Sequence, residues 1–132
     1  MRKPSFANLF YFFFIKYLLF YILMMFKNKD FTLIQLNQLR NLSDIFFYLW
    51  IFLFLPVVCF IIFSLPIYFI FKLKNAVVFI IFLILVLAAE YVSYTYSASQ
   101  IDLFNGVYNE LLSIVLLIAF YFKVIKLKFK KD

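Results

Sequence analysis

The stretch IFFYLWIFLFLPVVCFIIFSLPIYFIF, residues 45–71, contains no charged residue in its 27 positions. As a helix this block would extend roughly 40 Å, whereas the hydrocarbon core of a bilayer is about 30 Å thick. The block is therefore long enough to cross a membrane with a tilt or a bend. Pro56 and Pro66 each remove a helical hydrogen bond and crowd the preceding turn, so we expect kinks at these two positions.

Three more apolar blocks lie on either side of this stretch, and four such blocks predict an all-α integral membrane protein with about four transmembrane helices. The expected elements form one transmembrane domain over residues 1–132, with spans at 9–26, 45–71, 76–98 and 103–122 and a basic tail at 123–132. The first block resembles a signal peptide but has no small-residue cleavage site, so we interpret it as an uncleaved span. The Asn105–Gly106 pair favours a turn.

The composition agrees with a membrane protein and argues against an enzyme. Hydrophobic residues make up 68% of the 132 residues, more than a soluble domain of this size could bury. The chain has no His, a single Cys (Cys59) and a single Gly (Gly106), which excludes an imidazole base, a thiolate cage and a glycine-rich phosphate loop. We expect no catalysis, no cofactor other than bound lipid, no metal and no small-molecule substrate. Phe, Tyr, Ile, Asn and Lys, which have AT-rich codons, form half of the chain and indicate an AT-rich genome.

Residues 27–44 are the only sizeable polar segment, and they predict a short amphipathic helix on the membrane surface before the second span. Thr32 and Gln35 have the spacing of a capping box, and the leucines that follow recur on one side of a helix. This helix is expected to be a lead-in lying among the headgroups; docking of a partner is the alternative.

Lysines predict the orientation, because the cytoplasmic or matrix side of a membrane protein carries the excess of basic residues. The tail has five lysines and the 72–75 turn has two, whereas the 99–110 loop has none. Both chain ends and the 72–75 turn are therefore expected inside. The 27–44 segment would then lie outside despite its three basic residues, a conflict that a re-entrant hairpin at the prolines of 45–71 would remove.

Lys16 interrupts the first predicted span and Glu90 the third. An isolated charge in hydrocarbon costs at least about 2.5–3.5 kcal/mol, so both are expected to face protein or water. Spans one and three run in the same direction, and the two side chains would differ in depth by only about 6 Å. A Lys16–Glu90 ion pair is therefore feasible. The alternatives for Glu90 are a protonated carboxyl that donates to a hydroxyl and a partner in another subunit.

Small residues surround Glu90 at helical spacing. Ala89, Ser93 and Ser97 repeat every four residues, a pattern that lets helix backbones approach closely, and Tyr94 is predicted on the same side. We therefore predict that these residues and Glu90 form the packing face of the third span.

The basic tail is expected to contact anionic lipid headgroups. An RNA contact is disfavoured because the tail lacks Arg, and no nucleic-acid partner is expected. The predicted headgroup contacts are Lys123, Lys126, Lys128, Lys130 and Lys131.

Taken together, these features favour a non-catalytic structural or accessory subunit of a larger membrane complex, with other membrane subunits and lipids as its partners. Candidate hosts are a respiratory or ATP-synthase type complex of an AT-rich organelle, or a bacterial envelope or secretion machine. The membrane would be the bacterial or mitochondrial inner membrane, with the C-terminus on the cytoplasmic or matrix side. The alternative is a small proton- or ion-coupled carrier that works through Glu90.

Overall fold

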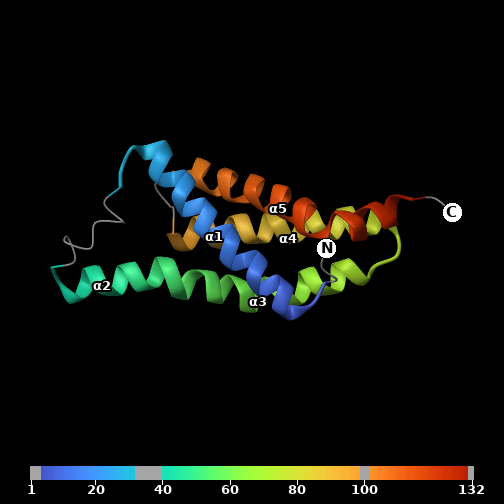
Figure 1. Cartoon of the computed structure of the whole chain (residues 1–132), viewed down its shortest axis with the longest axis horizontal. Coiled ribbons are helices and arrows are strands. Elements are labelled where there is room, and N and C mark those ends of the chain that lie inside the picture. Colours follow the sequence, from blue (N-terminus) through green and yellow to red (C-terminus); the bar gives the residue numbers. More distant parts are fainter. Residues whose placement is uncertain (1–3, 32–39, 99–101, 131–132) are drawn as a thin grey trace.

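A computed structural model describes residues 4–31, 40–98 and 102–130, and all regular structure in these residues is helical. The elements are α1 (Phe6–Asn28), α2 (Leu42–Leu49), the π-helical turn η3 (Trp50–Phe54), α3 (Leu55–Lys72), α4 (Ala76–Ala98) and α5 (Leu103–Phe129). The predicted all-α class is thus confirmed for the described residues. Figure 1 shows the helices running along one long axis.

Three of the described helices are long and apolar enough to cross a membrane. They are α1, the continuous helix Leu42–Lys72 and α4, and they support the prediction of a membrane protein. The 27 residues of α5 also match the length of a span, but Asn105, Asn109 and Glu110 lie in its first three turns. Passage of α5 through the membrane stays a prediction.

The second span is a single helix rather than a hairpin. Residues 42–72 continue without a break from α2 through η3 into α3, so the re-entrant alternative is wrong. Leu42 starts this helix next to Asn41, whose backbone N–H donates to Asp44 Oδ2 at 3.2 Å. The predicted surface helix falls mostly in 32–39, outside the described residues, and its described end is part of the span.

The two prolines of this helix have different surroundings. Pro56 has no N–H to donate, and the turn before it is widened, because the Leu55 N–H bonds to the Trp50 carbonyl five residues back. Pro66 lies inside α3, which continues through it.

The four long helices pack as a ring in which each lies mainly against two others. α1 lies against α3 and α5, and α4 also lies against α3 and α5, so that α1 and α4 are on opposite sides of the ring. In Figure 1 α1 runs obliquely across the other helices. Phe6 stacks on Tyr68 near the end of α3, with ring centroids 4.9 Å apart. The start of α1 therefore lies at the same end of the bundle as the 72–75 turn.

A single glycine permits the closest approach between α4 and α5. A Cβ atom on Gly106 would lie 2.5 Å from Thr95 Oγ1 and 2.6 Å from Tyr91 Cε2, which is closer than real contacts allow. The predicted Asn105–Gly106 turn is wrong, because both residues lie inside α5, which starts after its N-cap Asp102. Glycine serves here for helix packing and not for a turn.

The basic tail predicted at 123–132 is helical over most of its described length. Helix α5 bends at Tyr121, whose φ of −119° and ψ of 19° are not helical, and then continues to Phe129. Lys128 of this extension donates to the Leu73 carbonyl and lies 5.1 Å from the Phe79 ring centroid. Partial burial lowers the pKa of the Lys128 ammonium. The C-terminal helix therefore closes the bundle at the end where α1 begins.

Candidate functional site

A buried ion pair crosses the centre of the bundle. Lys16 of α1 donates to Glu90 Oε1 of α4, and their side chains are 0% and 1% exposed. The inward stripe of α1 explains the placement of Lys16, since the buried residues follow one another every three or four positions. That stripe comprises Leu9, Phe12, Phe13, Lys16, Tyr17, Phe20, Tyr21 and Met24. The structure thus contains the Lys16–Glu90 ion pair, which the similar depths of the two residues in their predicted spans had indicated to be feasible.

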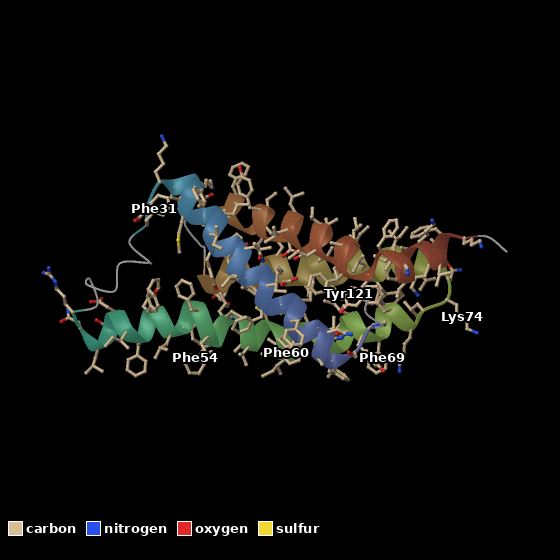
Figure 2. The ribbon with its side chains drawn as sticks, in the orientation of Figure 1. Phe31, Phe54, Phe60, Phe69, Lys74 and Tyr121 are labelled. Atoms are coloured by element: carbon tan, nitrogen blue, oxygen red, sulfur yellow. The ribbon has the colours of Figure 1, made fainter. Side chains whose placement is uncertain are left out.

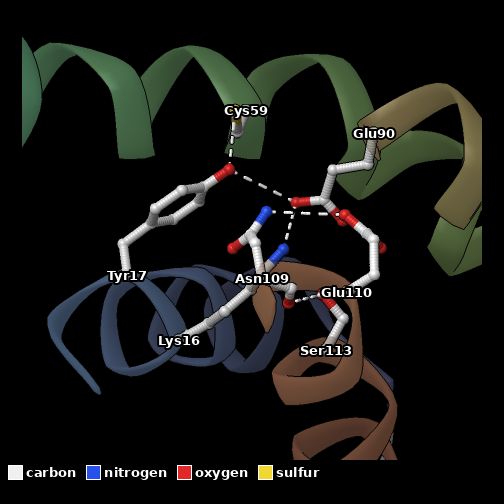
Figure 3. Close-up of polar contacts among 7 residues, drawn as sticks. All are labelled: Lys16, Tyr17, Cys59, Glu90, Asn109, Glu110 and Ser113. Carbon is white, nitrogen blue, oxygen red and sulfur yellow. Dashed lines mark hydrogen bonds and ion pairs between the residues drawn. The ribbon is translucent and has the colours of Figure 1, made fainter. Parts of the chain in front are cut away.

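Tyr17 extends the pair toward α3. Its hydroxyl lies 3.0 Å from Cys59 Sγ and 3.4 Å from Glu90 Oε1 (Figure 3). Because a phenol has one hydrogen, all three groups are satisfied when the Cys59 thiol donates to Tyr17 and Tyr17 donates to Glu90. The Lys16 ammonium also lies 5.0 Å from the centroid of the Tyr17 ring and 5.9 Å from that of Phe13. Aromatic faces therefore take the place of water around the ammonium.

α5 supplies the polar groups on the other side of Glu90. Asn109 Nδ2 donates to Glu110 Oε1 at 3.4 Å, and Ser113 Oγ donates to the Asn109 carbonyl at 3.2 Å. Asn109 and Ser113 are fully buried, and Glu110 is half-buried. In Figure 3 the carboxyl groups of Glu90 and Glu110 point toward each other. We call Lys16, Tyr17, Cys59, Glu90, Asn109, Glu110 and Ser113 the polar cluster.

Three oxygens of the polar cluster are buried without a hydrogen-bond partner among the described residues. They are Glu90 Oε2, Glu110 Oε2 and Asn109 Oδ1. A buried acceptor without a partner loses its hydration and gains nothing in return, which typically costs about 1–3 kcal/mol, and more for a charge. Each of these oxygens is thus a place where a proton or another small ligand would stabilise the protein.

The packing face predicted for the third span is only partly present. Glu90 and Tyr94 are buried, and the Tyr94 ring lies 5.3 Å from that of Phe20. Ala89, Ser93 and Ser97, however, are all exposed in this chain, so they do not pack against its other described helices, and packing of these three residues on another subunit stays a prediction. The inner side of α4 consists instead of Phe79, Leu87, Glu90 and Tyr94. Large side chains bury more area than Ala or Ser, and their burial outweighs the close approach that a small-residue stripe would allow.

The remaining predicted residues do not belong to the polar cluster. Pro56 and Pro66 belong to the wall formed by α3. Among the predicted headgroup lysines, Lys123, Lys126 and Lys130 are exposed, Lys128 is bound to Leu73, and Lys131 lies outside the described residues.

Sequence reasoning missed five members of the polar cluster, namely Tyr17, Cys59, Asn109, Glu110 and Ser113. A signal was present for α5, because Gly106, Asn109 and Ser113 recur at helical spacing along one side of the fourth block. Tyr17 gave no such signal, since it is one of 10 tyrosines. Cys59 is the single cysteine, but it lies in a run of apolar residues that shows no polar pattern around it.

The described residues contain no group of three or more His, Cys, Asp or Glu side chains that could hold a metal ion. No protein-family model, curated protein or solved structure matches this chain. The geometry of the polar cluster and of the outer surface is therefore the basis for assigning a function.

Proposed function

We propose that this protein is a non-catalytic structural subunit of a larger membrane complex, and that the Lys16–Glu90 pair clamps its own helices together. The observation that carries the proposal is the pair itself, which joins the opposite helices α1 and α4 with both side chains withdrawn from the surface. A site that processes a substrate must be reachable from outside, whereas a clamp works best when sealed from water and lipid.

The outer surface supports packing against lipids and other subunits. Large apolar side chains project from the helices in Figure 2, and none of the residues of α2 is buried within the chain. Phe46, Phe47 and Trp50 are 67%, 61% and 43% exposed. Contiguous apolar surface of this kind is covered by a membrane or by a partner in a folded protein.

We further propose four spans in the bacterial or mitochondrial inner membrane, with both chain ends on the cytoplasmic or matrix side. Lys72 and Lys74 lie at the same end of the bundle as the start of α1 and the last turns of α5. The basic residues at this end are expected to contact lipid headgroups. At the opposite end Lys27 pairs with Asp102 at 3.2 Å, which reduces the positive charge presented there.

One observation favours the alternative, a small proton- or ion-coupled carrier. Glu90 has a second carboxyl, Glu110, pointing toward it, and both retain a buried oxygen without a partner among the described residues. Under this alternative Glu90→Gln abolishes transport by the protein in liposomes.

Purification tests the subunit proposal. The tagged protein is extracted from its native membrane in a mild detergent, and the copy number of each co-purifying protein is measured. We expect other membrane proteins in a fixed ratio, and a lower ratio for Glu90→Ala because the bundle that presents the outer surface is loosened. A protein that purifies alone or only with itself, and that transports a solute in liposomes, would contradict the proposal.

A further inference from the structure

We infer that Glu90 and Glu110 together bind one proton, so that the polar cluster is a proton-binding site in which Glu110 donates to the Glu90 carboxylate. This inference goes beyond the clamp, since it concerns the second carboxyl and holds whether or not other subunits cover the outside. It also differs from the carrier alternative, because it requires no passage through the bundle.

The unpartnered oxygens carry the argument. Glu90 is 1% exposed and uses Oε1 to accept from Lys16 and Tyr17, which leaves Oε2 without a donor among the described residues. Glu110 uses Oε1 to accept from Asn109 and likewise leaves Oε2 without one. The two carboxyl groups point toward each other (Figure 3). A hydrogen between the two groups gives Glu90 Oε2 a donor, whereas two carboxylates would leave both remaining oxygens unsatisfied.

The balance of charge in the polar cluster also indicates one bound proton. Lys16 is the one base in the polar cluster, and it offsets one carboxylate. The other groups that face the carboxyls are Tyr17 from α1, Cys59 from α3, and Asn109 and Ser113 from α5, and none of them is a cation. A second carboxylate would stay uncompensated in surroundings of low dielectric constant. One proton on the carboxyl pair makes the whole cluster neutral.

A proton fits this site better than a metal cation. Sodium and calcium need a shell of several oxygen ligands, and the polar cluster offers three oxygens that lack a partner among the described residues. A proton needs only two oxygens, and it occupies no volume of its own in a closely packed interior.

Infrared spectroscopy of the protein in nanodiscs at neutral pH tests the inference, because a protonated carboxyl has a carbonyl stretching band that a carboxylate lacks. We expect the wild-type protein to show the band and Glu110→Gln to lose it while staying folded, since glutamine has nearly the shape of a protonated glutamate. Asp30→Asn, which changes an exposed carboxyl, is the matched control and should keep the band.

Substitution of Lys16 tests whether the two carboxyls of the wild-type protein bind one proton. Without the ammonium both carboxyls must be protonated to stay neutral, so Lys16→Met should raise the band to about twice its wild-type area. A wild-type protein without the band, or a Glu110→Gln protein that retains it, would overturn the inference. A band that disappears when sodium is added would assign the site to a cation instead and would also overturn it. Glu110→Gln leaves the Lys16–Glu90 pair intact, so its infrared spectrum tests the inference even if Lys16→Met does not fold.

Discussion

Lys16 and Glu90 stabilise the bundle as a pair, and the loss of either one leaves the other group buried without its partner. Removing one partner of a buried ion pair typically costs about 3–5 kcal/mol, because the remaining group must either stay charged without its counter-charge or change its protonation state. We therefore expect Lys16→Met and Glu90→Leu each to lower the unfolding temperature in mild detergent strongly. The double variant should recover most of the loss, since it removes both charges.

The pair formed by Lys27 and Asp102 provides the control for this experiment. Its side chains are 30% and 43% exposed, and exposed pairs contribute about 0–1 kcal/mol. Lys27→Met should therefore change the unfolding temperature little. Equal losses for Lys16→Met and Lys27→Met, or a double variant no more stable than the singles, would show that the buried pair is not a clamp.

Replacement of Gly106 by alanine is expected to destabilise the protein, whereas the same replacement in an exposed helix usually stabilises it. Alanine in place of an exposed helical glycine stabilises a helix by about 1 kcal/mol. Here the added methyl group would collide with Tyr91 and Thr95, so Gly106→Ala should destabilise the protein by about 1–3 kcal/mol. Val107→Ala, on the exposed side of the same turn, is the control in the same unfolding measurement. A more stable Gly106→Ala protein would mean that α4 and α5 are not in close contact there.

Single residues in this chain differ in how far their surroundings can be predicted. The approach of Lys16 and Glu90 follows from the depth of each residue in its span, because the rise per residue of a helix is fixed. The face of α4 does not follow from the stripe Ala89, Ser93 and Ser97, since burial depends on the side chains of the neighbouring helices. The proximity of Glu110 to Glu90 likewise depends on the pairing of α4 with α5, which no local pattern reveals.

The positions of the helices are what the sequence predicts best, and the exact ends of the helices are what it predicts worst. Each predicted span lies inside an observed helix, because an apolar run in hydrocarbon has to satisfy its own backbone hydrogen bonds. The helices extend past the apolar runs at both ends of α1 and at the end of α5. A helix continues past its apolar run as long as its backbone hydrogen bonds are made. The lysines at these helix ends permit this, because lysine has a high helix propensity.

The π-helical turn η3 gives a prediction at this scale. A π-helical turn contains one residue more than an α-helical turn. The residues before η3 are therefore rotated by about 100° about the helix axis relative to α3. This rotation places Phe52 against Tyr21, with ring centroids 4.9 Å apart. Pro56→Ala supplies the missing N–H, so the turn should become α-helical and Phe52 should turn away from α1.

Cross-linking measures this rotation. In a Cys59→Ala background, cysteines are placed at positions 21 and 52 and joined by a bifunctional thiol reagent about as long as the two rings that they replace. The yield of the cross-link is compared with and without the further substitution Pro56→Ala, and it should be high when Pro56 is present and low in the Pro56→Ala variant. Equal yields would show that the proline does not maintain η3.

The order of the helices around the ring is a property of the whole molecule that the sequence does not contain. Any of the apolar helices could lie next to α1, because lipid and neighbouring helices are almost equally apolar. The choice depends on side-chain packing and on a few polar contacts, of which the polar cluster and the Lys27–Asp102 pair are examples. With four spans, both ends of the chain would lie on the same side of the membrane.

Cysteine labelling with a reagent that does not cross membranes tests this arrangement and the passage of α5. In a Cys59→Ala background, single cysteines are placed at Lys29, Lys74 and Lys130, all of which are exposed. Four spans place Lys74 and Lys130 on one side and Lys29 on the other, and the positive-inside rule makes the side of Lys74 the cytoplasmic or matrix side. If α5 does not cross, Lys130 should instead be labelled together with Lys29. The position of Lys130 thus distinguishes four spans from three, because Lys29 and Lys74 lie on opposite sides in either case.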